Sequence, residues 1–468
     1  MAVAHPFEGS WSDAAPVPFW LDRRDAPAAA DPLVGDTTTD LVIVGGGFTG
    51  LWTAIQAREL DPTRDVVLLE QDTVGFGASG RNGGFCDSSL THGLRNGVER
   101  FPEEIRRLEQ LGAENLDGIH DTIERYRIDC DWTPTGTMAV AVEPYQVEQL
   151  RSAEELHRSF DHRVRILDRD EVRAEVASPT YLGGLWLLDH TVLVDPARLA
   201  WGLRRAALEL GVRIHERTRA TGLEPEGDGV VVSTPRGRVH ARRAVLATNA
   251  FPPLARSIRR YVIPVYDYVL MTEPLTPAQM DEIGWRGRQG LADSGNQFHY
   301  YRLSDDDRIL WGGYDAIYHY GNGVAAELEH RPETFDRLAE QFFATFPQLE
   351  GIRFTHRWAG AIDTCSRFCV MWGTALGGRA SYAVGYTGLG VGSSRFGARV
   401  ALDLIGGMET ELTKLRFVRS KPVPFPPEPV RYAGVQLTRR AIARADRREG
   451  RRGPWLKLID AMGLGFDS

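Results

Sequence analysis

The 468 residues of this chain are enough for two or three domains and a large hydrophobic core. The formal net charge is −8, so broad binding to nucleic acid is not expected. No apolar run approaches the roughly 18 residues of a membrane span. The N-terminus lacks a basic start followed by an apolar stretch. We therefore expect a folded cytoplasmic protein with neither a membrane span nor a secretory signal.

The cysteines and lysines narrow the chemistry. The four cysteines contain no C-x-x-C pair, so a dithiol reductase and a zinc ribbon are unsupported, and no metal site is expected. Lysine first occurs at Lys414, so no earlier residue can form a Schiff base or complete a P-loop. No G-x-S-x-G or H-E-x-x-H motif is present, so hydrolase chemistry has little support.

The N-terminal part predicts an arm followed by a βαβ unit. Residues 1–38 are rich in Ala, Pro and Asp, and three aromatic residues would anchor this arm: Trp11, Phe19 and Trp20. Residues 40–44 are a short apolar run typical of a buried parallel strand. Residues 51–60 have the apolar spacing of a helix, and residues 66–70 predict a second strand.

The turn between the first strand and the helix carries G-x-G-x-x-G. Gly45 allows the tight turn, Gly47 lets the backbone approach a pyrophosphate, and Gly50 lets helix and strand pack closely. The helix N-terminus offers free N–H groups to phosphates. Glu70 ends the second strand and would accept hydrogen bonds from a ribose diol. Together these features predict a dinucleotide site.

A second glycine-rich run, residues 75–84, follows the second strand and suggests a flavin nucleotide, whose ring system needs close contact with small residues. Its Gly-Ala-Ser-Gly-Arg-Asn-Gly-Gly segment resembles the D-amino-acid oxidase (DAO) superfamily of FAD enzymes, which includes glycine and sarcosine oxidases. Within it, the run is most similar to the bacterial branch of γ-glutamylputrescine oxidoreductases. The resemblance implies FAD as the cofactor.

Further segments match this superfamily in order. A helix is expected after Asp195, a strand at 211–215, a β ribbon at 230–233 and 239–240, a strand at 244–250, and a glycine segment after Tyr382 leading into a helix that ends near Leu404. The resemblance implies the following FAD-binding residues: Gly45, Gly47, Phe48, Thr49, Gly50, Glu70, Gln71, Gly77, Ala78, Ser79, Arg81, Asn82, Gly83, Gly84, Phe85, Ala220, Ala247, Thr248, Asn249, Gly388, Leu389, Gly390 and Val391.

The expected fold is α/β: a Rossmann-like, glutathione-reductase-like FAD-binding domain with an inserted α+β substrate domain built on an antiparallel sheet. The FAD-binding domain would comprise residues 39–100, 190–255 and 355–410. The substrate domain would comprise residues 101–189 and 256–354. Residues 101–185 would be mostly helical, and the second segment would have strands at 262–272, 297–303 and 308–313 and a helix at 332–346. Residues 411–468 would form an arginine-rich extension after a proline-rich stretch.

The resemblance implies oxidation of an amine by hydride transfer from carbon to flavin N5, giving an imine that water hydrolyses to a carbonyl compound and an amine. Such a reaction needs positioning more than a protein nucleophile. Polar and aromatic side chains near the flavin are therefore the substrate-binding candidates: His299, Tyr300, Tyr301, Trp358 and Asp363. Aromatic rings suit a cationic amine, and Asp363 would pair with an ammonium group.

Three departures from the superfamily bear on the substrate and the cofactor. Ile362 stands where glycine and D-amino-acid oxidases have a carboxylate-binding arginine, which counts against a simple α-amino acid. Trp358 stands where monomeric sarcosine oxidases attach flavin to a cysteine, so FAD is expected to be non-covalent. The lysine that activates oxygen in those enzymes has no counterpart before Lys414, so oxygen and another electron acceptor both remain open.

Three functions remain open at this point. The first is an amine oxidoreductase, either oxidase or dehydrogenase. The second is an oxidase of N-substituted or D-amino acids. The third is a flavin subunit that depends on a partner docked through the arginine-rich tail. If the tail does not dock a partner, it would be a solvated helix or would contact an anionic membrane surface.

Overall fold

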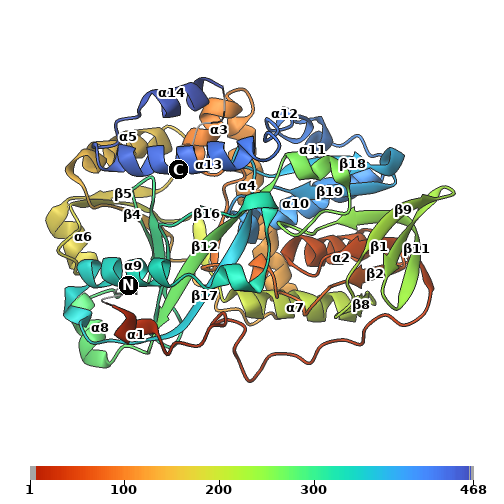
Figure 1. Ribbon diagram of the computed structural model, residues 1–468, viewed down its shortest axis with the longest axis horizontal. Helices are drawn as coiled ribbons and strands as arrows, with labels where there is room; N and C mark the ends of the chain where they lie inside the picture. The colour runs from red at the N-terminus through yellow and green to blue at the C-terminus, as the bar shows by residue number, and fades with distance from the viewer. Residues whose placement is uncertain (1–6, 463, 465–468) are drawn as a thin grey trace.

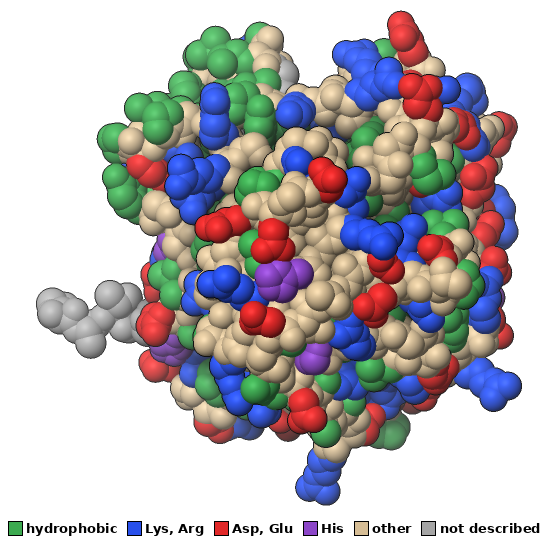
Figure 2. Space-filling model, turned by 90° about the vertical axis from the view of Figure 1, so that its right-hand side faces the viewer, with side chains coloured by type: hydrophobic (Ala, Val, Ile, Leu, Met, Phe, Trp, Pro, Cys, Tyr) green, Lys and Arg blue, Asp and Glu red, His purple; other side chains and the backbone are tan. Residues whose placement is uncertain are grey.

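The structure is a computed structural model that describes residues 7–462 and residue 464. Two sheets and their helices form its two halves (Figure 1). None of the helices in the described part of the chain is long and apolar enough to cross a membrane. On the face that lies at the right of Figure 1, basic and acidic side chains are interspersed (Figure 2).

The first sheet has eight strands, and its centre is the predicted βαβ unit. Strand β1 (Thr37–Val44) pairs in parallel with β2 (Val66–Leu69) and with β11 (Gly237–Leu246). The sheet is completed by β8 (Arg213–His215), β9 (Gly222–Glu226), β10 (Gly229–Thr234), β18 (Met371–Ala375) and β19 (Ala380–Val384). The expected ribbon strand 239–240 and the expected strand 244–250 form one continuous strand, β11, which ends at Leu246.

Successive residues of β1 face opposite sides of this sheet, as the pleat requires. Leu41 and Ile43 pack into a core with three helices, whereas Val42 and Val44 pack into the core on the other face. The helices are α2 (Phe48–Leu60), α7 (Pro196–Glu209) and α10 (Gly390–Ile405), and α2 lies between the other two (Figure 1). The apolar run at 40–44 is therefore buried on both faces, which explains its near-absence of polar residues.

The second sheet has nine strands. Its order is β16 (Ile317–Tyr318), β12 (Ile263–Thr272), β15 (Ile309–Gly313), β14 (His299–Leu303), β13 (Gly290–Asp293), β4 (Thr137–Ala141), β6 (Gly183–Leu187) and β5 (Val164–Leu167), and β17 (Phe354–Thr364) also pairs with β12. The helices of this half include α5 (Pro144–Arg158), α6 (Arg169–Glu175), α8 (Pro277–Ile283) and α9 (Pro332–Thr345). A short two-stranded sheet joins β3 (Phe85–Asp87) to β7 (Thr191–Leu193).

The structure differs from the expected domain boundaries in two places. Strand β17 falls within the range expected for FAD binding, yet it pairs antiparallel with β12 along its whole length. Helix α4 (Ile105–Arg125) falls within the expected substrate domain, yet Leu108 and Ile119 pack in the core of the first sheet. Residues 137–187 also contribute three strands to the second sheet, so residues 101–185 are less helical than expected. Sequence order alone did not show which sheet each segment would join.

Both ends of the described chain pack against the rest. Helix α1 (Glu8–Trp11) lies against α9, and Trp11 and Trp20 are 2% and 1% exposed, so they anchor the arm as expected. Burying a large apolar side chain contributes about 2–3 kcal/mol. Three short helices are α3 (Leu94–Arg100), α11 (Glu411–Lys414) and α12 (Arg416–Arg419). The last two helices of the chain, α13 (Val430–Asp446) and α14 (Pro454–Ala461), lie along the upper edge of Figure 1.

Candidate active site

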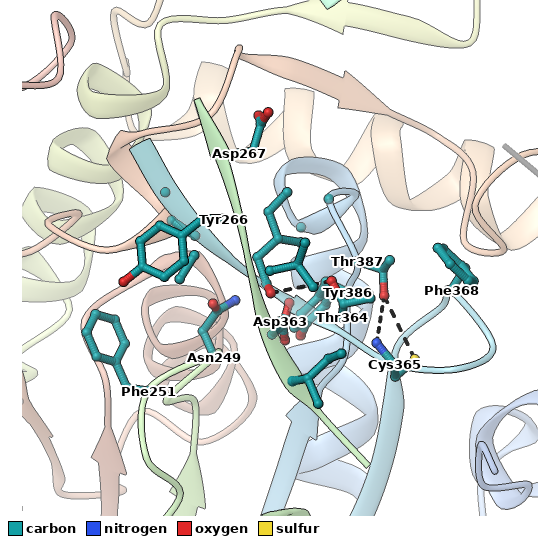
Figure 3. A pocket seen from close by; sticks show the side chains of 18 of the residues that line it. Asn249, Phe251, Tyr266, Asp267, Asp363, Thr364, Cys365, Phe368, Tyr386 and Thr387 are labelled. Carbon is teal, nitrogen blue, oxygen red and sulfur yellow. Dashed lines mark hydrogen bonds between the residues drawn. The ribbon is translucent and has the colours of Figure 1, made fainter. Parts of the chain in front are cut away.

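A cavity of about 1580 Å³ is lined by residues of both sheets and of the C-terminal tail. Typical sites for one drug-sized molecule are about 300–1,000 Å³, so this cavity has room for a dinucleotide and a second small molecule. In Figure 3, Asn249, Phe251 and Tyr266 lie on one side of strand β12, and Asp363, Cys365, Tyr386 and Thr387 lie on the other. The cavity therefore joins the glycine-rich turns to the second sheet.

The first glycine turn has no room for side chains. Gly45 has φ +113°, and a Cβ there would lie 2.3 Å from the Ala247 carbonyl oxygen. At Gly47, the N-cap of α2, a Cβ would meet Ser79 Oγ at 2.8 Å. At Gly50 it would lie 1.9 Å from the Gly45 carbonyl oxygen. Gly45 and Gly47 line the cavity, whereas Gly50 is buried against the turn and serves its packing.

Glu70 lines the cavity and also holds the first glycine turn in place. Its carboxylate accepts hydrogen bonds from the Gly46 amide at 2.7 Å and from the Asp72 amide at 2.9 Å. Burial raises the pKa of Glu70, although these amide bonds oppose the rise. A carboxylate fixed by two amides retains acceptor capacity for a ribose hydroxyl.

The second glycine loop is held by Arg81 and Asn82. Arg81 donates to the Ala359 carbonyl at 2.9 Å and to Glu329 at 2.6 Å, so it ties the loop to β17. Asn82 donates to the Ala78 carbonyl and accepts from the Gly84 amide at 2.8 Å. Gly84 has φ +77° and a Cβ there would lie 2.1 Å from the Val194 carbonyl, so it packs behind the loop and does not line the cavity.

All of the residues expected to bind FAD except Gly50 and Gly84 line this cavity. Those that line it are Gly45, Gly47, Phe48, Thr49, Glu70, Gln71, Gly77, Ala78, Ser79, Arg81, Asn82, Gly83, Phe85, Ala220, Ala247, Thr248, Asn249, Gly388, Leu389, Gly390 and Val391. The Thr248 hydroxyl is buried without a hydrogen-bond partner among the described residues, which leaves a polar group to satisfy. The long helices α2 and α10 both begin at the cavity. The cradle therefore fits a dinucleotide with anionic phosphates.

Three substrate-binding candidates lie next to each other on β14, where successive side chains point to opposite faces of the sheet. Tyr300 lines the cavity, whereas His299 and Tyr301 point to the other face of the strand. His299 lies 2.6 Å from Asp293 and stacks on Trp311, and the Tyr301 hydroxyl is 2.6 Å from that of Tyr181. These two side chains are buried on the other face of the second sheet and do not line the cavity.

Trp358 and Asp363 both have structural contacts on β17. Trp358 is buried off the cavity and donates to the Arg81 carbonyl at 2.8 Å. Asp363 lines the cavity, but its carboxylate accepts from the Gly385 amide at 2.6 Å. Burial raises the pKa of Asp363 to about 7. Asp363 therefore holds the turn that precedes α10, and its expected pairing with an ammonium group is disfavoured.

Asp267, which we did not identify from the sequence, is the better-placed carboxyl. It lies on β12 at the cavity wall and accepts a 2.5 Å hydrogen bond from the Tyr300 hydroxyl. Burial raises its pKa to about 6. Tyr266 and Phe251 line the same cavity and add aromatic surface. The alternation of apolar and polar residues at 262–272 predicted a strand there, but it did not show which face of that strand would line the cavity.

The C-terminal tail also lines the cavity, which its sequence did not suggest. The tail contributes the proline-rich segment 423–427, apolar residues of α13 such as Val435 and Ile442, and Trp455 of α14. Arg439 lines this cavity and an adjoining one of about 520 Å³, which is further lined by Arg337, Arg440, Arg444 and Arg447. The tail thus closes one side of the main cavity with apolar residues and lines the adjoining smaller cavity with arginines.

Cys365 also lines the cavity, and its thiol is held within the protein. Its Sγ lies 3.1 Å from the Cys369 carbonyl oxygen and 3.4 Å from that of Gly385, and Figure 3 shows its contacts with Thr387. Burial raises the pKa of this thiol. A protonated and hydrogen-bonded thiol is a poor nucleophile.

Comparisons with known proteins agree with this geometry. Residues 40–404 match the family model described as "DAO: FAD dependent oxidoreductase". The chain is 32% identical over 398 residues to a gamma-glutamylputrescine oxidoreductase of Escherichia coli (strain K12), covering 83% of this chain and 88% of that protein. It is 28% identical to the "Probable oxidoreductase OrdL" of Haemophilus influenzae, over 84% and 89% of the two chains. The solved structure of a glycine oxidase from Geobacillus kaustophilus has a TM-score of 0.66 at 19% identity, covering 82% of this chain and 99% of that one.

Proposed function

Because the chain belongs to the DAO family of FAD-dependent oxidoreductases, we propose that it oxidises a C–N bond of a primary or secondary amine. The substrate loses a hydride and a proton to become an imine, which water hydrolyses to a carbonyl compound and a smaller amine. Bound FAD supplies the hydride acceptor for this chemistry. The observation that carries the proposal is the buried Asp267–Tyr300 pair in the wall of the cavity.

In this proposal the FAD is held non-covalently by the two glycine turns, Glu70 and the first turn of α10. The glycines bring backbone amides close to the phosphates, and the helix N-termini add favourable dipoles. The buried, protonated Cys365 thiol and the position of Trp358 outside the cavity support non-covalent binding.

Asp267 would draw the ammonium form of the substrate into the cavity and take up its proton. With a pKa of about 6, Asp267 is ionised at neutral pH and attracts a cation at a buried position. The amine must lose a proton to react, and a carboxylate hydrogen-bonded to Tyr300 is placed to hold that proton at Oδ1 or Oδ2.

Oxidation of N-substituted or D-amino acids is the second candidate. Arg439 lines the cavity and favours this candidate, because its cation could bind a substrate carboxylate. Ile362 also lines the cavity and cannot bind a carboxylate. A simple α-amino acid therefore fits less well than an amine whose carboxylate is distant from the reacting nitrogen. A partner-dependent flavin subunit is a third candidate, supported by the exposed Arg440 and Arg444 on α13 and the exposed Arg447 that follows it.

Anaerobic stopped-flow absorbance tests the main proposal. The FAD-loaded protein is mixed with a panel of mono- and diamines, γ-glutamylated amines, sarcosine, glycine and D-alanine, and bleaching of the oxidised flavin band is followed before air is admitted. Bleaching by an amine but not by the amino acids supports the proposal. Fast recovery in air indicates an oxidase, and slow recovery indicates a dehydrogenase. Bleaching by the amino acids alone would favour the second candidate, and no bleaching at all would refute amine chemistry.

A further inference from the structure

Away from the cavity, one carboxylate and three imidazoles gather where elements of the two halves meet. Glu109 lies on α4, His157 is near the end of α5, His162 follows α5, and His190 lies between β6 and β7. One possible ligand atom from each of Glu109, His162 and His190 lies within 4.8 Å of the other two. None of these four residues lines the cavity or takes part in the proposed reaction.

The separation between His162 and Glu109 is that of two ligands of one metal ion. His162 Nε2 is 3.4 Å from Glu109 Oε2, and these side chains are only 8% and 14% exposed. Two ligands held 2.0–2.1 Å from a tetrahedral zinc ion are about 3.3 Å apart. The His162 and His190 rings lie next to each other, with their centroids 3.9 Å apart.

Neighbouring groups hold one nitrogen of each ring. His162 Nδ1 lies 2.9 Å from His157 Nδ1, and His190 Nδ1 lies 3.1 Å from Ser88 Oγ. Each ring therefore has its Nε2 directed elsewhere: that of His162 faces Glu109, and that of His190 lies 3.6 Å from Asp189 Oδ1. Metal-binding histidines are oriented in this way, with the second nitrogen fixed by a hydrogen-bonding neighbour.

We propose that Glu109, His162 and His190 form a binding site for a divalent transition metal of the zinc class, with His157 and Ser88 orienting the two imidazoles. Two imidazoles and one carboxylate suit zinc better than magnesium or calcium, which prefer oxygen ligands. The exposed carboxylate of Asp189 or a water molecule would supply the fourth position. The ligands are 53 and 28 residues apart in the chain, which explains why no sequence motif indicated the site.

A metal ion here would act as a structural clamp. Helix α4 packs into the core of the first sheet, whereas α5 and β6 belong to the second half. One ion bound by Glu109 of α4 and by the histidines that follow α5 and β6 would join the two halves. Ser88 follows Asp87, which lines the cavity, so the clamp also lies close behind one wall of the active site.

Zinc titration of the protein tests this proposal. Tag-free, FAD-loaded protein is treated with EDTA, dialysed and titrated with Zn²⁺ alone in a calorimeter, and its thermal midpoint is measured with and without the metal. We expect one zinc ion per chain and a higher thermal midpoint with zinc. Cobalt in place of zinc should give tetrahedral d–d absorbance at wavelengths longer than the flavin bands.

Matched variants separate this site from non-specific binding. His162→Ala and Glu109→Gln should weaken zinc binding by more than about 100-fold, since even orienting partners contribute 10- to 100-fold. His240→Ala, which changes a histidine of β11 in the first sheet, should bind zinc like the wild type. Glu109→Gln preserves shape and keeps the test valid if the histidine variant does not fold. Absence of stoichiometric zinc binding by the wild type would overturn the proposal, as would equal binding by the wild type and both ligand variants.

Discussion

Replacing Asp267 by Asn should make the protein more stable and less active at once. Burial raises the pKa of Asp267 from 3.8 to about 6. A difference of about two pKa units corresponds to roughly 3 kcal/mol of unfolding free energy, at about 1.4 kcal/mol per unit. Asparagine keeps an oxygen that accepts the Tyr300 hydrogen bond but carries no charge to desolvate. We therefore expect Asp267→Asn to gain about 2–3 kcal/mol at neutral pH.

The sign of the pH dependence follows from the raised pKa. The folded state binds the Asp267 proton more tightly than the unfolded state, so the wild type loses stability as pH rises from 3.8 through 6. The stability gain of Asp267→Asn should therefore be absent below about pH 3.8, grow across this window and be complete above about pH 6. Thermal midpoints of the FAD-loaded proteins at several pH values measure this difference.

The same variant should lower kcat/KM for amines by about 100-fold or more, the usual contribution of a positioned acid or base. Asp228→Asn, which changes an exposed turn residue, is the control and should alter neither property. An Asp267→Asn protein that is less stable than the wild type at neutral pH, or whose stability difference does not depend on pH, would refute the electrostatic argument. Unchanged amine turnover would refute the catalytic one.

The remaining predictions concern the cofactor and the tail. Gly45→Ala should abolish FAD binding, because its Cβ would lie 2.3 Å from the Ala247 carbonyl. Gly35→Ala, at another position of positive φ but with no atom within 4 Å of the new Cβ, should retain it, and the flavin absorbance of the purified proteins decides. Acid precipitation of the wild type should release all flavin into the supernatant, as in Cys365→Ser. Flavin retained in the wild-type pellet alone would show a covalent bond to that thiol. Deleting residues 430–468 removes α13 and α14 from the cavity wall, so quenching of flavin fluorescence by iodide should increase. Equal quenching in both proteins would show that the tail does not shield the flavin.

The sequence predicted the FAD site well where the site is formed by the backbone of a glycine turn. The run 40–50 predicted a strand, a tight turn and a helix, because only glycine tolerates the close approaches found at Gly45 and Gly50. The order of such segments along the chain identified the family and its FAD. These features depend on residues adjacent in sequence, and the structure places most of the expected FAD-binding residues around one cavity.

Tertiary structure alone decided which side chains meet across that cavity. Tyr300 reaches it, whereas His299 and Tyr301 do not, because a one-residue step along a strand reverses the face. Asp267 became a candidate only when β12 and β14 were brought together through the intervening β15. The tail entered the site through long-range packing that no local motif specifies. The chain's own periodicity and glycines thus determined the cofactor cradle. The pairing of distant strands and the docking of α13 determined the rest of the cavity, because those contacts depend on the folded positions of residues far apart in sequence.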